Sequence, residues 1–186
     1  MSQRSAAEWL RLAFLFASIL FLLWISRPTI ASVCAGGALV IIGELVRFWA
    51  AGHLYKTEEL ITSGPYRFTR NPLYLGRFLI LTGVAIMAWR PDGLNLLALL
   101  LGWLIFFGYY MPRKERIEPA RLEAKHGEPY RRYFENVPAL IPRFTPWGVN
   151  TATWKKERFQ RNREGWTAIG FAALVIAFLI KALEGA

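Results

Sequence analysis

The chain of 186 residues has few residues of the kinds that build metal or disulfide sites. Cys34 is its single cysteine, which excludes an intramolecular disulfide and a cysteine-rich zinc site. With only two histidines, His53 and His126, a multi-histidine metal centre is not expected either. Charged residues are scarce, at 19% of the chain, whereas hydrophobic residues make up 54%. This composition excludes a disordered or collagen-like chain, and we predict no metal site.

The hydrophobic residues are grouped in blocks. A transmembrane helix needs about 20 mostly apolar residues, and five runs meet or approach this length. The turn sequence Arg90-Pro-Asp-Gly93 joins the third run to the fourth as a helical hairpin. The sequence therefore predicts an all-α polytopic membrane protein, a single membrane domain over residues 1–186 with about five transmembrane helices. The predicted spans are Trp9–Ile25, Thr29–Ala51, Leu73–Trp89, Leu94–Met111 and Gly165–Leu183.

The formal net charge of +10 is concentrated in two loops. Thirteen of the 23 lysine and arginine residues lie between Pro112 and Glu164, and three more lie between the second and third spans. Apolar blocks with basic loops are typical of membrane proteins, so we predict contact with a lipid bilayer and none with nucleic acid. The positive-inside rule places both loops and the N-terminus in the cytoplasm, and the C-terminus on the opposite side.

Three ionisable residues lie inside the apolar runs, where such groups are costly unless they are paired or face an internal cavity. Glu44 and Arg47 are one helical turn apart and are expected to pair. The pair is either a structural ion pair near the inner interface or a polar wall for a charged ligand. Arg77 lies one turn after Leu73 and can extend its charge to the inner interface.

The first basic loop ends in Arg70-Asn-Pro-Leu-Tyr-Leu-Gly76. Pro72 suits the first turn of a helix, and Asn71 before it can cap that helix. Free N–H groups at the helix start, the positive end of the helix dipole and Arg70 together favour an anionic group. Gly76 would let another backbone or a ligand approach closely.

The second basic loop predicts a cytoplasmic helical segment between the fourth and fifth spans. Pro119–Gly127 and Glu128–Pro138 each have a proline near a helix start, and the glycine between them is expected to be a left-handed C-cap. Glu115 and Glu118 are three residues apart and share one helix face just beyond the fourth span. Thr151–Glu164 is a basic amphipathic stretch, predicted to rest on anionic headgroups.

These loops resemble the integral-membrane isoprenylcysteine carboxyl methyltransferases and phospholipid N-methyltransferases. The resemblance covers residues 52–144, a methyltransferase-like cofactor-binding core in which two motifs enclose the helical hairpin. The motif residues are Gly64-Pro-Tyr-Arg67 and Arg70-Asn-Pro-Leu-Tyr-Leu-Gly76, then Glu118, Leu122, Gly127, Tyr130, Tyr133, Val137-Pro138 and Ile141-Pro142.

The chain departs from the isoprenylcysteine pattern in both motifs. Asn71 stands where that family has the histidine of Arg-His-Pro-x-Tyr-x-Gly, which is closer to the phospholipid methyltransferases. In the second motif Glu118-Pro119 stands at the paired glutamates, and His126 replaces a phenylalanine. One carboxylate is therefore missing, unless Glu115 supplies it from the preceding turn.

The resemblance implies S-adenosylmethionine as the cofactor, bound from the cytosol, with a methyl acceptor that enters from the lipid. The implied catalytic residues are Tyr74, Glu115 and Asn71. The implied cofactor-binding residues are Arg70, Asn71, Pro72, Tyr74, Gly76, Glu115, Glu118, His126, Gly127 and Tyr130. The implied substrate-binding residues are Tyr66, Arg77, Arg131 and Arg132.

Each implied role has a chemical reason. Glu118, helped by Glu115, would accept hydrogen bonds from ribose hydroxyls or pair with the methionyl ammonium, and Arg70 would hold the methionyl carboxylate. Asn71 and Tyr74 would lie near the sulfonium. A base among Glu115, His126 and Tyr74 would take the proton of an amine acceptor, whereas a carboxylate acceptor needs none.

The acceptor stays open between a phospholipid amine and an isoprenoid carboxylate. Two other functions remain as alternatives, and the sequence predicts no particular oligomeric state. One alternative is an NADPH-dependent sterol or isoprenoid reductase of related layout, although Leu73 stands where its motif has an asparagine. The other is a non-enzymatic lipid-binding membrane protein.

Overall fold

A computed structural model describes residues 6–55, 59–150, 152–162 and 164–185. Within these ranges every regular element is a helix, which confirms the predicted all-α class. In chain order the elements are α1 (Ala6–Ile25), α2 (Ile30–His53), the 3-10 turn η1 (Gly64–Arg67), α3 (Pro72–Met87), α4 (Leu94–Ile105), the π-helical turn η2 (Phe106–Tyr110), α5 (Met111–His126), α6 (Glu128–Asn136), α7 (Lys156–Asn162) and α8 (Glu164–Glu184).

Three helical segments are long and apolar enough to cross a membrane: Ile30–His53, the continuous Leu94–His126 and Glu164–Glu184. The third predicted span is α3, which is apolar but has only 16 residues. The first predicted span, Trp9–Ile25, falls in α1, half of whose side chains lie outside the described residues. The chain is thus an integral membrane protein, and the count of about five spans stays a prediction.

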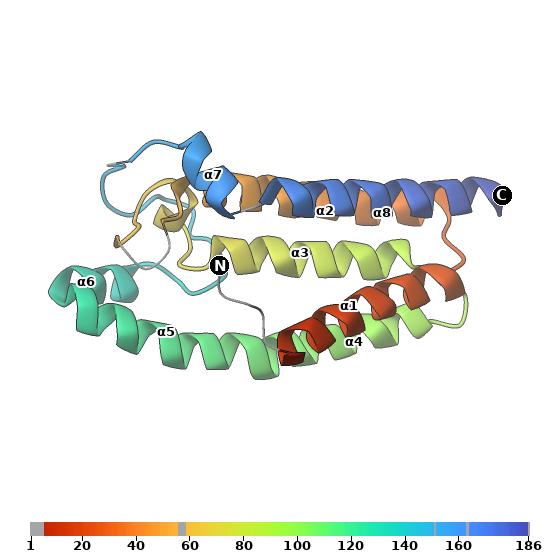
Figure 1. Ribbon diagram of the computed structural model, residues 1–186, viewed down its shortest axis with the longest axis horizontal. Coiled ribbons are helices and arrows are strands. Elements are labelled where there is room, and N and C mark those ends of the chain that lie inside the picture. The colour runs from red at the N-terminus through yellow and green to blue at the C-terminus, as the bar shows by residue number, and fades with distance from the viewer. Residues whose placement is uncertain (1–5, 56–58, 151, 163, 186) are drawn as a thin grey trace.

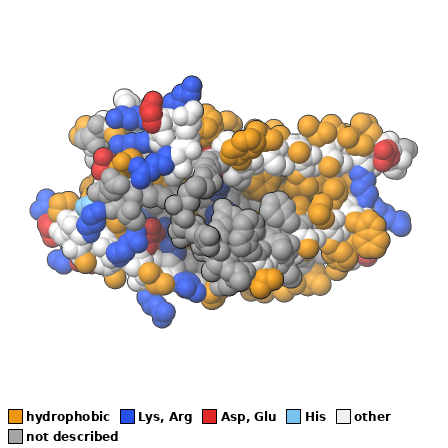
Figure 2. All heavy atoms as spheres, in the orientation of Figure 1, with side chains coloured by type: hydrophobic (Ala, Val, Ile, Leu, Met, Phe, Trp, Pro, Cys, Tyr) orange, Lys and Arg blue, Asp and Glu red, His pale blue; other side chains and the backbone are white. Residues whose placement is uncertain are grey.

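The helices form two layers with α3 between them (Figure 1). α2 and α8 lie side by side in one layer, and α4 continues into α5 in the other. Charged side chains gather at the end that carries α6 and α7, while hydrophobic side chains predominate among the described residues elsewhere in this view, with a few charged ones at the opposite end (Figure 2). The polar end of the molecule is therefore built from the two basic loops.

α2 and α3 pack backbone against backbone. A Cβ atom added at Gly36 would lie 2.3 Å from the carbonyl oxygen of Gly83, and one added at Gly83 would lie 2.4 Å from that of Gly36. This contact at small residues is typical of membrane helices, whose association depends on close packing. The surrounding core consists of Val33, Val40, Ile80, Val84, Met87, Ala88, Phe178 and Ala182.

The helix that holds the fourth predicted span, Leu94–Met111, does not end with that span. The helix continues through Pro119 to His126 without a break, so the predicted helix start at Pro119 is wrong. Nearer the start of this helix, Pro112 has no N–H, and the turn before it widens so that the Met111 N–H bonds the Phe106 carbonyl. Glu115 and Glu118 therefore lie on one continuous helix that extends from the hairpin.

Gly127 joins α5 directly to α6. Its φ of 58° is positive as predicted, but its ψ of −135° lies outside the left-handed helical region. A glycine tolerates this conformation, in which it ends one helix and begins the next. The predicted helix beginning at Glu128 is confirmed.

α7 occupies part of the basic stretch after α6, whose residues 151 and 163 lie outside the described ranges. It holds the C-terminus of α2, where backbone carbonyls lack partners within the helix. The Asn162 side-chain amide donates to the carbonyls of Ala51 (3.1 Å) and Leu54 (3.0 Å), and Arg158 donates to that of His53 (2.8 Å). α7 is thus a cap on α2.

Removing this cap is expected to loosen α7 without unfolding the bundle. Asn162→Ala deletes the hydrogen bonds to α2 and should cost about 1–2 kcal/mol of local stability. Amide hydrogen exchange over residues 156–162 should become faster. Gln160→Ala, at an exposed position of the same helix, is the control. Equal exchange rates in both variants would show that Asn162 does not hold α7.

Candidate functional site

A cavity of about 420 Å³ lies between α2, η1, α3, α5, α6 and the first residue of α8. It brings together the two sequence motifs, which are separated by the helical hairpin. Nine of the residues singled out from the sequence line it: Tyr66, Arg70, Asn71, Pro72, Tyr74, Arg77, Glu115, Glu118 and Tyr130.

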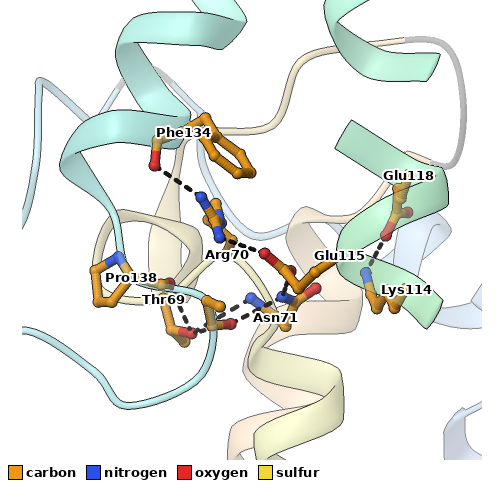
Figure 3. A network of polar contacts seen from close by, with 9 residues as sticks. Thr69, Arg70, Asn71, Lys114, Glu115, Glu118, Phe134 and Pro138 are labelled. Carbon is orange, nitrogen blue, oxygen red and sulfur yellow. Dashed lines mark hydrogen bonds and ion pairs between the residues drawn. The ribbon is translucent and has the colours of Figure 1, made fainter. Parts of the chain in front are cut away.

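Glu115 is the centre of a polar network that joins α5 to the start of α3 (Figure 3). Its Oε1 accepts a hydrogen bond of 2.8 Å from the Asn71 amide, and its Oε2 is ion-paired with Arg70. Arg70 also donates to the Phe134 carbonyl at 2.7 Å, and its guanidinium lies 3.7 Å from the centre of the Phe134 ring. The network fixes α3, α5 and α6 relative to one another.

Asn71 precedes α3 as predicted, but its side chain does not cap that helix. Instead the amide donates to Glu115 and, at 2.8 Å, to the Ala139 carbonyl in the chain after α6. Its backbone carbonyl accepts from the N–H groups of Tyr74 and Leu75, both at 3.0 Å. Tertiary contacts have therefore replaced the local cap that the sequence indicated.

Glu118 lies one turn beyond Glu115 and is less tightly held. Among the described residues Glu118 forms an ion pair with Lys114 on the same helix, and the Glu118 side chain is 41% exposed. The Lys114 ammonium in turn lies 4.8 Å from the centre of the Tyr74 ring, and the Arg77 guanidinium lies 5.3 Å from it. Glu118 thus offers acceptor oxygens to a ligand, whereas two cations already lie near Tyr74.

Three tyrosines from η1 and α6 line the cavity: Tyr66, Tyr130 and Tyr133. Burial raises the pKa of Tyr130 to about 12 and raises those of Tyr66 and Tyr133 still further above the ordinary value. The Tyr133 hydroxyl donates to the Tyr66 carbonyl at 2.8 Å. At neutral pH all three phenols keep their protons and act as hydrogen-bond donors.

The predicted pair of Glu44 and Arg47 is present and has a third member that the sequence analysis missed. Arg47 Nε lies 3.8 Å from Glu44 Oε1, and Arg47 Nη2 donates to Glu164 Oε2 at 2.5 Å. Glu164 is the first residue of α8 and lines the cavity together with Arg47. The sequence analysis used Glu164 only as the end of the basic amphipathic stretch, and its nearness to an apolar run is the one signal that could have singled it out.

Gly76 does not line the cavity. An added Cβ there would lie 2.5 Å from Arg47 Cγ and 2.6 Å from the Gly43 carbonyl oxygen. The sequence predicted that Gly76 would let either another backbone or a ligand approach closely. In the structure it is the backbone and Arg47 side chain of α2 that approach it. The motif glycine lets the Arg47 side chain pass between α2 and α3.

Four more residues with implied roles lie outside the cavity wall. Arg131 and Arg132 are exposed on α6, where both form ion pairs with Glu128 and Arg131 also pairs with Glu123. His126 and Gly127 lie at the end of α5, away from the cavity lining. The geometry therefore does not bring these four to the residues that meet around Glu115.

Fold and cavity define a class of protein: a helical integral membrane protein with a polar site at one end of its bundle. Residues 31–111 match the profile of the phospholipid methyltransferase family, and two curated proteins are similar over most of this chain. The chain belongs to this family, within the isoprenylcysteine and phospholipid methyltransferase superfamily that its motifs resemble.

One relative is the cobalt-zinc-cadmium resistance protein CzcN of Cupriavidus metallidurans, 30% identical over 80% of this chain and 68% of its own length. Another is the nickel-cobalt-cadmium resistance protein NccN of Alcaligenes xylosoxydans xylosoxydans, 29% identical over 66% of this chain and 54% of its own length. No solved structure matches the chain.

Proposed function

We propose that the protein is an S-adenosylmethionine-dependent methyltransferase that acts on a membrane-embedded acceptor at the cytoplasmic leaflet. The observation that carries the proposal is the cavity that joins Arg70–Tyr74 to Glu115–Tyr130. Both motifs of the superfamily contribute to one cavity, although the hairpin separates them in the sequence. The acceptor would be a phospholipid amine or an isoprenoid carboxylate.

The residues present fit S-adenosylmethionine. Its amino-acid part carries both charges, and the cavity wall offers both carboxylates and guanidinium groups. Arg70 Nε is buried and has no hydrogen-bond partner in the described part of the chain, so it is a donor for a carboxylate. The volume of about 420 Å³ lies within the usual range of about 300–1,000 Å³ for small-molecule sites.

When bound, the sulfonium supplies a methyl group that is already activated for transfer. The chain then has to position the acceptor in line and exclude water. Arg70 would hold the methionyl carboxylate, and Glu118 would accept from the ribose or the methionyl ammonium. In this proposal Glu115 does not contact the cofactor, because both of its carboxylate oxygens already have partners. Its role is to hold Arg70 and Asn71 in place.

The names of the two relatives connect those proteins with resistance to heavy metals. We propose that this chain contributes to metal resistance by methylating an acceptor in the membrane. Among the described residues no group of three or more His, Cys, Asp or Glu side chains could hold a metal ion.

Cofactor binding tests the proposal directly. The purified full chain should bind S-adenosylmethionine in calorimetry, and Glu118→Gln should weaken binding about 10- to 100-fold, because a hydrogen bond to a charged group contributes about 1.5–3 kcal/mol. Its thermal stability should stay near that of the wild type, since Glu118 is half exposed. Glu135→Gln, on the exposed surface of α6, is the control. A chain that binds NADPH and not S-adenosylmethionine would contradict the proposal.

A further inference from the structure

The cluster of Glu44, Arg47 and Glu164 has a charge that its own members do not balance. Two carboxylates surround one guanidinium, so the formal charge of the cluster is negative. Arg47 is 7% exposed and Glu164 9%, in a membrane-spanning part of the protein where uncompensated charge is costly. A cation brought by a ligand would balance the cluster.

The cluster also has unused hydrogen-bonding capacity. Arg47 Nε and Glu44 Oε1 are buried and have no hydrogen-bond partner among the described residues. Buried polar atoms of this kind call for an explanation such as a missing ligand. A carboxylate accepts on both oxygens, so Glu164 can accept from a ligand N–H while its Oε2 keeps the contact with Arg47.

The position of the cluster points to the acceptor rather than the cofactor. Arg47 Nη1 approaches the Leu73 carbonyl, at 3.4 Å, on the side of α3 that faces α2 and α8. The groups proposed to hold the cofactor are different ones on the same cavity lining: Arg70, just before α3, and Glu118 on α5. Arg77, which is exposed and lines the same cavity, has no carboxylate partner in the described ranges.

We infer that Glu164, held by Arg47 and supported by Glu44, binds the ammonium group of an amine-bearing lipid and takes its proton. This inference rests on the proposed function and decides between the two acceptor classes it leaves open. A carboxylate acceptor would be repelled by a cluster of net negative charge, whereas an ammonium neutralises it.

The reaction balances as follows. The ammonium R–NH₃⁺ gives a proton to the Glu164 carboxylate and becomes R–NH₂ with a free electron pair. That pair forms the new N–CH₃ bond while the S–CH₃ bond breaks and leaves its electrons on sulfur. The products are R–NH₂–CH₃⁺, a neutral thioether and a protonated Glu164, which releases its proton to water.

Several charged and titratable groups lie around Glu164. Arg47 of α2 is ion-paired with both Glu164 and Glu44, and the buried Tyr66 phenol of η1 is close enough to Glu164 for the two to interact. Tyr74 and Arg77 of α3 line the same cavity.

The test uses the full chain in nanodiscs of phosphatidylglycerol with or without phosphatidylethanolamine, and methyl-labelled S-adenosylmethionine. Wild type should label the amine lipid, and Glu164→Gln should lower the rate by about 100-fold or more, the usual contribution of a general base. Cofactor affinity should change less than about twofold. Glu123→Gln, whose partner is the exposed Arg131, is the matched control and should keep the wild-type rate.

A purely structural role would give a different pH profile. Between pH 7 and 9 the free fraction of a primary amine of pKa near 10 rises about 100-fold, so the Glu164→Gln rate should recover with pH. The triple variant Glu44→Gln/Arg47→Met/Glu164→Leu fills nearly the same space without charge, which keeps the packing if Glu164→Gln does not fold. It should bind the cofactor and still fail to label the amine lipid.

The outcomes separate this inference from the proposed function. Binding of S-adenosylmethionine without label on phosphatidylethanolamine, a Glu164→Gln rate like that of the wild type, or a loss that pH does not restore would each overturn the inference and leave the methyltransferase proposal intact. Absence of cofactor binding by the wild type would overturn both.

Discussion

Replacing Glu115 by leucine is expected to abolish S-adenosylmethionine binding and to destabilise the protein by about 3 kcal/mol. Glu115 bonds both Arg70 and Asn71, so its loss leaves a largely buried guanidinium and an amide short of a partner. Breaking a buried ion pair by removing one member costs about 3–5 kcal/mol, and the partial exposure of Glu115 places it at the lower end. Thermal unfolding and calorimetry on the same preparation measure the two effects.

A double variant separates charge from architecture. In Glu115→Leu/Arg70→Met neither member remains to be left unpaired, so the thermal stability should recover most of the loss. Cofactor binding should not recover, because the variant lacks both Arg70, the proposed hydrogen-bond donor to the methionyl carboxylate, and Glu115, which holds Arg70 in place. Normal affinity in Glu115→Leu alone would show that the network is not needed for the site.

Gly36→Ala is expected to have the largest effect on folding of any single methyl group added to the bundle. The new Cβ would lie 2.3 Å from the Gly83 carbonyl oxygen, 2.6 Å from Met87 Cγ and 2.8 Å from the Met87 nitrogen. Two of these atoms belong to the backbone and cannot rotate away, so α2 and α3 have to separate. Overpacking costs about 1–3 kcal/mol in ordinary cores, and we expect about 3 kcal/mol or more here.

The consequence should reach the cavity, because Arg47 on α2 and Asn71 at the start of α3 lie on opposite sides of the same interface. Gly170→Ala is the matched control, since an added Cβ on this α8 glycine meets nothing within 4 Å. Thermal unfolding in detergent should show a large decrease for Gly36→Ala and almost none for Gly170→Ala. Equal melting temperatures would mean that α2 and α3 are not in backbone contact.

Patterns along the sequence were sufficient to predict the class of the fold and part of the cavity lining. Apolar blocks require membrane helices because an unpaired backbone cannot lie in lipid. The motif around Arg70 and the spacing of Glu115 and Glu118 identified residues that do meet at one cavity. Local pattern failed at Pro119, which was expected to begin a helix and instead lies inside one.

At Asn71 the local preference is strong, and contacts with distant segments override it: the Asn71 amide bonds Glu115 and Ala139 instead of the helix start. The same holds for Gly76, whose missing side chain admits Arg47 and not a ligand. A preference of about 1 kcal/mol for a cap is easily exceeded by two buried hydrogen bonds.

By itself the sequence determined that the chain is a helical membrane protein and which two motifs carry its family. Only the tertiary structure decided that Arg47 pairs with Glu164, 117 residues away, at the wall of the cavity. Hydropathy and spacing describe neighbours along one helix, whereas this ion pair depends on how α2 and α8 pack against each other. That packing is set by contacts between helices, which no local pattern records.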